Sequence, residues 1–494
     1  MAEFDLAIIG GGINGVGIAR DAAGRGLRVA LFEQNDLASG TSSASSKLIH
    51  GGLRYLEHGA FRLVRAALSE REVLWRMAPH LIQPLRFVLP LEGASRSPFV
   101  LRLGLFVYDL LGRRAILPGT RPLDLITDEA GHPLKRRFHH AYEYSDCFAD
   151  DARLVVLNAV DAAERSASIR TRTRCVRAER GEEWRLILNA RGQRDVVTAR
   201  ALVNVSGPWV ETVAETVLQQ RPLRRLRLDK GSHIVVRRLY DHERAYILQA
   251  VDGRVVFAIP FARDFTLIGT TDEPFVGDVA AVAPTEAEIE YLCGVINSYF
   301  RAAIAPADVV WAFAGVRALY DDGAGRPQDV GRDYALILDK RLGEAPLLTV
   351  YGGKLTTYRR LAEDALDRLS RFFPQSRPWT ATSPLPGGDF PYDGMPALLA
   401  RARRQWPFLG EDQARRLVAA YGTRIDRVLG AATGPEALGT PFGAGLSAAE
   451  VRYLMRTEWA ETADDVLWRR SKLGLRLSQG ERAALERFMA RPDG

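Results

Sequence analysis

The chain has 494 residues, of which 47% are apolar and 26% are charged, and its 67 Lys and Arg against 60 Asp and Glu give a net charge of +7. This composition is typical of a soluble globular protein with two to four domains and excludes disordered, fibrous and disulfide-stapled chains. The longest run without a charged residue, Leu6–Ala19, has 14 residues, fewer than the roughly 20 apolar residues of a membrane-spanning helix. The acidic N-terminus is unlike a signal peptide, and three distant cysteines favour a reducing cytosol over a disulfide framework or a metal cluster.

The N-terminal residues carry the clearest motif. The run Phe4–Ile9 predicts a strand, Gly10–Gly15 (GGGING) a tight turn, the apolar spacing that follows a helix, and Arg28–Phe32 a second strand that ends at Glu33. Glycines in such a turn let the backbone approach a pyrophosphate at the helix N-terminus, and the acid accepts hydrogen bonds from ribose hydroxyls. We therefore predict a dinucleotide site, although this motif alone does not separate FAD from NAD.

The next segment favours a bulky cofactor. Asp36–Ser46 (DLASGTSSASS) is rich in small hydroxyl residues and leads into KLIHGGLRYLE, so that backbone N–H groups can crowd around the ligand. The sequence shows no second strand, GxGxxG turn and helix for a nicotinamide nucleotide. The substrate itself should therefore be the reductant, and the electrons should leave to an acceptor other than a nicotinamide.

Long motifs then identify a family. In chain order they are IIGGGINGVGIARDAAGRGL, SSASSKLIHGGLRYLEHG, EYSDCFADDARLV, NVSGPWV, KGSHIVV, IGTTDE and YGGKLTTYRRLAEDAL. Together they resemble the FAD-dependent glycerol-3-phosphate dehydrogenases, in particular the aerobic bacterial enzymes that deliver electrons to respiratory quinone. The later block EWAETADDVLWRRSKLG resembles the helical appendix of that family. One departure is Tyr351, which stands where the family has Phe before GGKLTTY.

The resemblance implies an α/β, Rossmann-like FAD-binding domain interleaved with an antiparallel-sheet substrate domain, as in the D-amino-acid-oxidase-like flavoproteins, and followed by a C-terminal α-helical domain. We expect the oxidoreductase unit over 1–382 and the helical domain over 383–494. Within the first unit the expected FAD-binding parts are about 1–75, 150–220 and 310–375, and the expected substrate and membrane parts are about 76–149 and 221–309.

Local patterns agree with this organisation. A helix is predicted over Tyr358–Phe373, a linker over Ser383–Gly388 (SPLPGG), and helices through Pro396–Ala490. Further short strands are predicted from β-rich runs: Thr171–Glu179, Trp184–Leu188, Ala201–Asn204, Ile234–Arg237, Ala245–Gln249, Val255–Ile259, Phe265–Gly269 and Leu347–Val350.

Oxidation of an alcohol by a flavin needs a base near the hydroxyl and positive charge for an anionic substrate. Four residues are candidate catalytic residues. His50, His233 and Lys354 lie within the matched motifs, and Arg317 lies in FAGVRALYDD. A lone His is more often structural, and most of the many arginines are surface charges. Lys354 has the strongest functional case because it follows two glycines.

The resemblance supplies the roles. It implies that Arg54, Tyr55, Arg317 and Lys354 bind glycerol 3-phosphate, and that His50 or His233 takes the C2 hydroxyl proton while a hydride passes from C2 to flavin N5. The products are dihydroxyacetone phosphate and reduced FAD, which a quinone reoxidises, and no metal is expected. The expected cofactor-binding residues are Gly10, Gly12, Gly15, Glu33, Thr41, Ser42, Ser46, Lys47, His50, Gly51, Gly52, Ser206, Gly207, Gly353, Lys354 and Thr356.

A quinone acceptor requires contact with a membrane. The segment Pro98–Leu117 (PFVLRLGLFVYDLLGRRAIL) has a narrow polar stripe with Arg102 and Asp109, an apolar remainder, and flanking arginines. It predicts a helix that lies on the anionic inner face of the cytoplasmic membrane and makes the protein peripheral. A helix buried in the protein or at a subunit contact is the alternative, and the oligomeric state stays open between monomer and homodimer.

Three other functions compete with this interpretation. The chain could be an oxidase that uses O₂, or a flavoprotein that acts on another hydroxy acid or an amine. A nucleic-acid-binding flavoprotein is a distant alternative, because the sequence lacks a basic stripe with interleaved aromatic residues. We expect no nucleic-acid partner.

Overall fold

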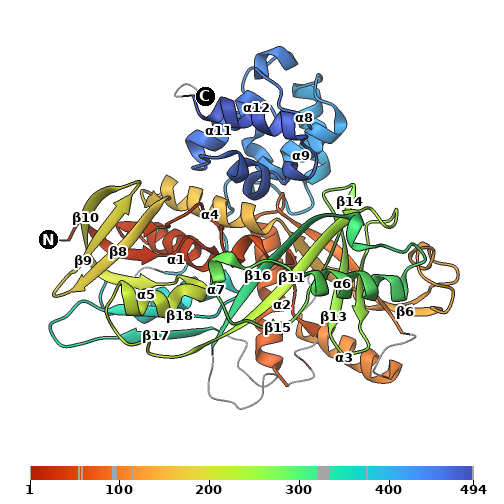
Figure 1. Cartoon of the computed structure of the whole chain (residues 1–494), viewed down its shortest axis with the longest axis horizontal. Helices are drawn as coiled ribbons and strands as arrows, with labels where there is room; N and C mark the ends of the chain where they lie inside the picture. Colours follow the sequence, from red (N-terminus) through yellow and green to blue (C-terminus); the bar gives the residue numbers. More distant parts are fainter. Residues whose placement is uncertain are drawn as a thin grey trace.

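The computed structural model describes residues 2–53, 56, 59–91, 97–112, 116–320, 334–373 and 377–491. Two β-sheets with their helices form one broad layer, and a helical domain made from the C-terminal residues is seated on one side of it (Figure 1). Among the described residues no helix combines the length and the apolar composition that crossing a bilayer would demand. Arg54 and Tyr55, two predicted substrate ligands, lie outside the described residues.

The first sheet has the doubly wound arrangement that the N-terminal motif predicts. Its order is β17-β18-β10-β1-β2-β7, with β9 and β8 attached beside β10. Strands β18, β10, β1, β2 and β7 are mutually parallel. The strands are β1 (Phe4–Ile9), β2 (Val29–Phe32), β7 (Ser168–Arg170), β8 (Thr173–Arg180), β9 (Trp184–Ala190), β10 (Gln193–Asn204), β17 (Ala335–Asp339) and β18 (Leu347–Tyr351).

Register within this sheet aligns three strand ends that are far apart in sequence. Ile9 at the end of β1 pairs with Asn204 at the end of β10, and Asn204 pairs with Thr349 in β18. Ligands of open parallel sheets bind beyond the carboxyl ends of the strands. The predicted cofactor segments that follow β1, β10 and β18 are therefore brought to one edge.

The second sheet is antiparallel apart from the pairing of β12 with β4. Its order is β15-β11-β14-β13-β12-β4-β6-β3, with β16 on β11 and β5 on β6. The strands are β3 (Leu48–Ile49), β4 (Ile82–Pro90), β5 (Arg121–Asp124), β6 (His140–Ala149), β11 (Leu226–Arg237), β12 (Ala245–Gln249), β13 (Val255–Phe261), β14 (Phe265–Gly269), β15 (Glu273–Pro274) and β16 (Val309–Tyr320).

Four boundaries differ from the sequence-based expectation. β16 belongs to the second sheet, although 310–375 was assigned to the FAD-binding part, because it pairs antiparallel with β11 along almost its whole length. β10 and β11 begin earlier than predicted, since their first halves (QRDVVTAR and LRLDKGSH) carry charged residues that hide the apolar pattern of a strand. The predicted helix over Tyr358–Phe373 ends at Leu369.

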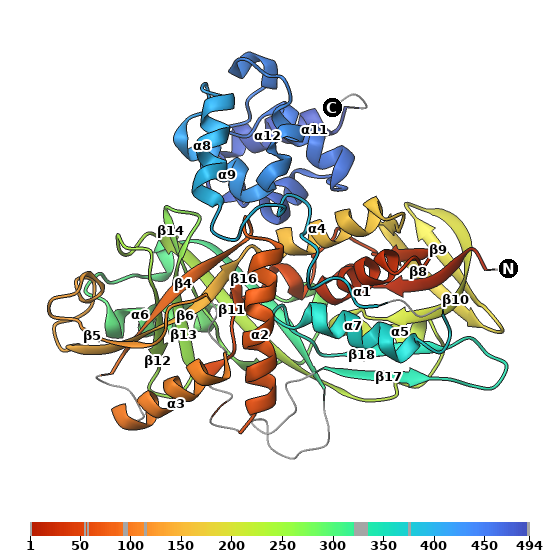
Figure 2. The same ribbon diagram turned by 180° about the vertical axis from the view of Figure 1, so that it is seen from behind.

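Three helices pack with the first sheet. α1 (Ile13–Gly24) packs against α4 (Asp151–Glu164) and α7 (Tyr358–Leu369), and together they contribute to one apolar core with the first sheet. The other helices of this layer are α2 (Phe61–Met77), α3 (Pro98–Leu111), α5 (Val210–Thr216) and α6 (Glu286–Tyr299). α3 lies at the edge of the layer opposite the C-terminal domain (Figure 2).

The C-terminal domain has a core of its own. The predicted linker Ser383–Gly388 is packed against the first domain, because Arg20 Nη2 donates to the Ser383 carbonyl at 3.0 Å and buried Leu385 N donates to the Met77 carbonyl at 2.8 Å. Its helices are α8 (Met395–Gln405), α9 (Glu411–Tyr421), α10 (Ile425–Leu429), α11 (Ala448–Thr457) and α12 (Gln479–Met489), with a π-helix η9 (Asp465–Arg470) between the last two.

Candidate active site

Glycine makes the aligned strand ends fit together. Gly10 follows β1 with φ of +123°, and a Cβ there would lie 2.7 Å from the Val205 carbonyl oxygen. Gly353 follows β18 with φ of +99°, and a Cβ there would lie 2.4 Å from Asn14 Nδ2. That amide donates to the Gly352 carbonyl at 3.2 Å. The two predicted cofactor segments thus meet at the start of α1, where a side chain on either glycine would collide.

The start of α1 has the form of a pyrophosphate cradle. A Cβ on Gly15 would lie 1.9 Å from the Gly10 carbonyl oxygen, so the turn can close only with glycine. Gly12 at the N-cap contributes no side-chain cap, and Ile13 N donates to Ser42 Oγ at 3.0 Å. Asn14 Oδ1 is buried without a hydrogen-bond partner among the described residues. The backbone amides of a helix N-terminus behind a glycine turn fit the diphosphate of a dinucleotide.

Glu33 follows β2 and closes the nucleotide side of this cradle. Its Oε2 accepts from Gly11 N and its Oε1 accepts from Asn35 N, both at 2.8 Å. Burial raises the pKa of the Glu33 carboxyl, and these two backbone hydrogen bonds partly offset that rise. A carboxylate has about four acceptor positions, so two remain for the hydroxyls of a ribose. The residues present therefore fit the adenosine end of FAD.

A short 3-10 helix, η1 (Thr41–Ser43), joins the nucleotide site to the second sheet. Thr41 Oγ1 donates to the Val316 carbonyl in β16 at 2.6 Å. Lys47 is buried, and its Nζ lies 2.8 Å from Asp151 Oδ2 at the start of α4. This ion pair engages the Lys47 ammonium and so fixes the path of the segment. Only the backbone of Lys47 and the neighbouring residues are then left to contact a cofactor.

His233, on β11, is buried at the junction of that segment and the sheet. Its ring stacks on Phe313 with centroids 5.0 Å apart, its Nε2 lies 2.9 Å from Ser46 Oγ, and its Nδ1 has no hydrogen-bond partner among the described residues. A Cβ on Gly269 would lie 2.2 Å from His233 Cδ2, so the ring fits closely between two strands. Burial, together with the charges of Lys47 and Arg317, lowers the pKa of His233 to about 3.

His50 follows β3 and is partly exposed. Its backbone N donates to Thr356 Oγ1 at 3.3 Å, and its ring meets Phe257 edge-on at 6.3 Å. Burial of the ring, with the nearby charges of Lys354 and Arg71, lowers the pKa of His50 to about 4. At neutral pH both candidate histidines are therefore uncharged and able to accept a proton.

Arg317, on β16, is a partly exposed cation whose charge reaches the ring of His233. Its Nη2 donates to Asp272 Oδ1 at 3.0 Å and to the Thr271 carbonyl at 3.2 Å, while 38% of the side chain stays exposed. Behind it, Thr271 Oγ1 donates to Glu288 Oε1 at 3.0 Å. Burial would raise the pKa of Glu288, but the hydrogen bonds from Lys230, Thr285, Ser232 and Thr271 lower it to about 2.

The remaining predicted cofactor residues follow β10, β3 and β18. Ser206 Oγ donates to Asn204 Oδ1 at 2.7 Å just beyond β10, and Gly207 has φ of +58°. Gly51 N donates to Tyr108 Oη of α3 at 2.8 Å, and Gly52 has φ of +73°. Lys354 and Thr356 follow β18, and Lys354 is close enough to His50 to influence its pKa.

Some residues at this site were missed by sequence reasoning. Asn14 lies inside GGGING, where a polar residue in the first turn of a buried helix was the available signal. Asp151 lies inside the matched block EYSDCFADDARLV and partners Lys47. Phe313 stacks on His233, a contact that no local pattern announces because it depends on the pairing of β11 with β16.

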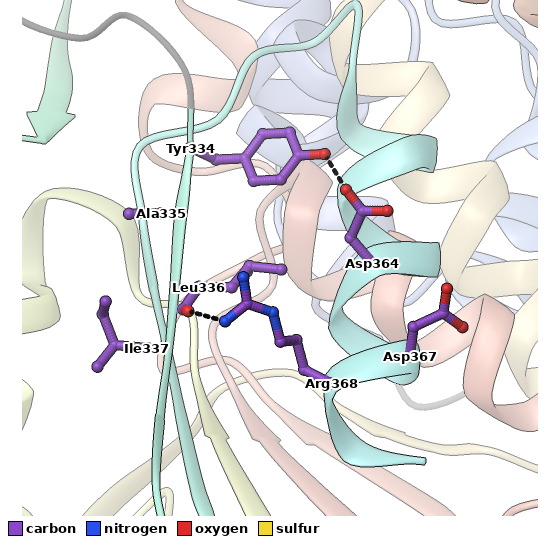
Figure 3. A pocket seen from close by; sticks show the side chains of 7 residues that line it. All are labelled: Tyr334, Ala335, Leu336, Ile337, Asp364, Asp367 and Arg368. Atoms are coloured by element: carbon purple, nitrogen blue, oxygen red, sulfur yellow. Dashed lines mark hydrogen bonds between the residues drawn. The ribbon is translucent and has the colours of Figure 1, made fainter.

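A cavity lies away from the cofactor segments and the candidate histidines. A cavity of about 540 Å³ opens between β17 and α7, where Tyr334 Oη donates to Asp364 and Arg368 Nη1 donates to the Leu336 carbonyl at 3.2 Å (Figure 3). None of the predicted site residues lines it. Among the described residues no three His, Cys, Asp or Glu side chains gather as a metal site requires. The strand-end constellation is therefore the candidate active site.

Comparison with known proteins agrees with the geometry. Residues 5–359 match the model of FAD dependent oxidoreductases, and residues 378–491 match the C-terminal domain of alpha-glycerophosphate oxidase. The chain is 52% identical to a glycerol-3-phosphate dehydrogenase of Pseudomonas aeruginosa, with 98% of this chain and 95% of the relative covered. It is 49% identical to D-erythritol 1-phosphate dehydrogenase of Brucella abortus (97% and 96% covered) and 47% identical to the aerobic glycerol-3-phosphate dehydrogenase of Escherichia coli (99% and 98% covered).

A solved structure supports the fold and the cofactor. The glycerol-3-phosphate dehydrogenase of Bacillus halodurans, in complex with FAD, superposes with a TM-score of 0.76 at 26% identity, covering 99% of this chain and 94% of that one. The glycine-lined cradle, the Glu33 acceptor and these similarities agree on FAD as the cofactor. The chain belongs to the FAD-dependent oxidoreductases, in the family of the glycerol-3-phosphate dehydrogenases.

Proposed function

We propose that this protein oxidises sn-glycerol 3-phosphate to dihydroxyacetone phosphate and passes the electrons to a membrane quinone. The observation that carries the proposal is Arg317, whose side chain is 38% exposed and bonded to Asp272, close to the neutral His233 and on the strand that Thr41 of the cofactor segment bonds. A guanidinium binds phosphate through two parallel hydrogen bonds. The substrate class follows from an anion-binding group and a proton acceptor at one place.

Each side chain has a definite task in this scheme. Arg317 and Lys354 bind the phosphate, with Arg54 and Tyr55 as further ligands carried over from the family resemblance. His50 or His233 takes the proton of the C2 hydroxyl, since a neutral imidazole is the form that accepts it. When bound, FAD would supply the two-electron acceptor for the C2 hydride and the route of the electrons to quinone. Asp272 orients Arg317, so that the phosphate fixes C2 at one distance from the base.

The two histidines differ in how they can serve. His50 lies near the predicted phosphate ligand Lys354, which supports a role on the substrate side of the site. His233 is buried, with Nε2 on Ser46 and with no hydrogen-bond partner for Nδ1 in the part of the chain that the structure describes. Replacing each by Asn and measuring the limiting rate of flavin reduction separates the roles, because loss of the base lowers that rate by about 10²- to 10⁴-fold.

A second substrate of the same class is favoured by one observation. The erythritol phosphate relative is about as similar to this chain as the glycerol phosphate relatives are. D-Erythritol 1-phosphate also carries a phosphate on the carbon next to a secondary alcohol. Arg317 could therefore bind its phosphate, and a histidine could take its hydroxyl proton. The two substrates differ by one carbon unit, and the fit of that extra unit decides between them.

The quinone part of the proposal draws on α3. One face of this helix packs inward through Leu105 and Tyr108, and the opposite face exposes Leu103, Phe106 and Leu110. The exposed fractions of these three side chains are 54%, 61% and 68%. A helix with one apolar face in solvent suits peripheral insertion at a membrane surface. Tyr108 bonds Gly51, next to His50, so this helix adjoins the site from which electrons would leave.

Anaerobic bleaching of the bound flavin tests the substrate. Glycerol 3-phosphate should bleach it fully at low concentration, whereas glycerol, lactate and amino acids should not, because they lack the phosphate that Arg317 binds. D-Erythritol 1-phosphate belongs in the same series, and a higher ratio of reduction rate to Kd would make it the substrate instead. Bleaching by lactate or by an amino acid alone would overturn the proposal. Stoichiometric hydrogen peroxide release in air would identify an oxidase.

A further inference from the structure

The block EWAETADDVLWRRSKLG (458–474) in the C-terminal domain has no part in the scheme above, yet its side chains reach into the FAD-binding unit. Glu458 pairs with buried Arg153 of α4, and Asp465 accepts from Arg172 at 2.8 Å. Arg470 donates to both oxygens of buried Asp36 at 2.8 Å. The pair with Asp36 fastens the block to the segment between Glu33 and the predicted cofactor hydroxyls, and the other two fasten it to α4 and to the loop after β7.

One side chain of the block continues into the active site through stacked rings. Trp468, in η9, stacks on Trp311 with centroids 4.7 Å apart and planes 28° apart. Trp311 contacts Phe313 at 4.5 Å, and Phe313 stacks on His233 at 5.0 Å with planes 9° apart. Trp311 and Phe313 are two residues apart on β16 and so share one face of the sheet. The series Trp468, Trp311, Phe313, His233, here called the ring stack, links the C-terminal domain to a candidate base.

The outer end of the ring stack is held on its other side. A Cβ on Gly474 would lie 2.5 Å from Trp468 Cε2, so the indole is confined between the Gly474 backbone and Trp311. Trp468 itself is only half-buried, and Lys472 Nζ donates to its carbonyl at 2.6 Å. Trp468 packs against the core of its own domain as well as against Trp311, so it can carry the position of that domain into the ring contacts of β16.

We propose that Trp468 is a positioning residue of the active site, which acts through Trp311 and Phe313 to hold the His233 ring against Ser46 and the cofactor segment. The proposal rests on the proposed function for its kinetic readout, though not for its spectroscopic one. If the indole is removed, Trp311 loses its support, Phe313 can tilt, and His233 leaves the position from which it acts. A displacement of about 1 Å at a reacting group can lower a rate by as much as 10²-fold.

Four variants of the holoenzyme test this assignment. Trp468→Ala should lower the limiting rate of anaerobic flavin reduction about 10-fold, while FAD content and the Kd of the substrate change less than twofold. Trp468→Phe, which keeps a ring, should restore most of the rate. Gly474→Ala pushes a methyl group into the indole and should lower the rate as Trp468→Ala does. Trp406→Phe alters a buried tryptophan of the same domain that lies outside the ring stack, and it should keep the full rate.

A double-mutant comparison shows through which residue Trp468 acts. If the effect passes through His233, adding Trp468→Ala to His233→Asn should lower the rate no further. A multiplied loss would overturn the assignment, and so would a wild-type rate in Trp468→Ala or in His233→Asn. If glycerol 3-phosphate fails to bleach the flavin, the comparison is made with whichever compound of the series does, so that failure of the substrate proposal is recognised separately.

Histidine NMR gives a readout that needs no substrate. In protein with labelled histidine rings, the signal that vanishes in His233→Asn is the signal of His233. The ring current of stacked Phe313 displaces that signal, so Trp468→Ala and Gly474→Ala should each shift it, and Trp406→Phe should not. An unmoved His233 signal in both variants would contradict the proposal even if the rates fell.

Discussion

Two edges of the broad layer formed by the two sheets differ in the side chains that they present. Beneath the C-terminal domain several contacts are buried ion pairs, with Asp36 held by Arg470 and Arg153 held by Glu458. At the other edge α3 leaves apolar side chains in solvent, Phe99 with 74% of its surface exposed. Buried charges therefore hold the C-terminal domain to the rest of the chain, whereas the apolar side chains of α3 are exposed where no described residue covers them.

The contrast separates specificity from adhesion. A buried ion pair contributes little net stability over an apolar pair, but it strongly penalises any arrangement in which one partner is unpaired. It therefore suits an interface that must form in one register, as the C-terminal domain does on the cofactor segment. An exposed apolar face discriminates little and suits a fluid partner such as a bilayer.

The largest effect is expected on α3. Changing Leu103, Phe106 and Leu110 together to Ser should lower membrane partitioning by at least a thousandfold, because burying each side chain contributes about 1.5–3 kcal/mol. Sedimentation with anionic vesicles measures it, and quinone turnover in membranes should fall while a soluble dye still accepts electrons. High salt should strip the wild type only in part.

A matched control removes exposed apolar side chains elsewhere. Val251, Val276 and Leu342 are almost fully exposed, and changing all three to Ser should leave partitioning as it is in the wild type. A folded α3 variant that still sediments with vesicles would show that another surface docks the protein. An α3 variant that unfolds or loses flavin would make the segment part of the core.

The next effect is expected at the ionic edge. Arg470→Ala leaves Asp36 buried with one of its partners gone, and removing one partner of a buried pair costs about 3–5 kcal/mol. The urea midpoint should fall, and FAD should be released earlier, since Asp36 belongs to the cofactor segment. Arg482→Ala breaks an exposed pair with Asp464, and its expected cost is about 0.2–1 kcal/mol. Equal losses in the two variants would refute the distinction drawn between the two kinds of contact.

A smaller effect is expected between the two edges. Arg317→Ala should weaken glycerol 3-phosphate binding about 10- to 150-fold, since a hydrogen bond to a charged group contributes about 1.5–3 kcal/mol. Titration of flavin absorbance gives the Kd, and FAD affinity and vesicle binding serve as internal controls. An unchanged Kd would remove Arg317 from the phosphate site.

The smallest effect is expected from pH. Because the pKa values of His50 and His233 lie near 4 and 3, either base stays neutral at pH 5.5, and the limiting rate of flavin reduction should change less than about twofold between pH 5.5 and 7.5. An imidazole with an ordinary pKa of about 6.5 would lose roughly tenfold over that range. Such a loss would show that the acting base titrates normally.

The same depressed pKa values affect stability with a definite sign. The unfolded chain, whose histidines titrate near pH 6.5, binds more protons than the folded one between about pH 4 and 6.5. The free energy of unfolding should therefore decrease as the pH falls through this window.

The sequence predicted those parts that depend on neighbours along the chain. The turn at Gly10–Gly15 follows from local backbone sterics. His50, His233 and Arg317 were named from short stretches of sequence, and their roles stay predictions. The same holds for the amphipathic pattern of α3. Which apolar face of that helix is inward was not predictable, because it depends on Tyr108 meeting Asp146 across the fold.

Contacts between distant segments could not be predicted. Arg470 and Asp36 are 434 positions apart, and nothing near either one announces the other. The ring stack likewise requires the register of β11 against β16 and the seat of the C-terminal domain. The membership of β16 in the second sheet was missed for the same reason, because strand pairing is a tertiary property.

The aligned ends of β1, β10 and β18 also bear on how the protein is made. Asn14 and the Gly352 carbonyl that it bonds are 338 positions apart, so one side of the cofactor cradle leaves the ribosome long before the other. At about 5–20 residues per second the delay is roughly 17–70 s. Until β10 is synthesised, β1 has no partner on that side, and until β18 is synthesised, β10 lacks its other parallel neighbour, so these apolar edges need protection from aggregation. A nascent chain stalled before Leu347 should hold no flavin, which makes cofactor capture a late event in biosynthesis.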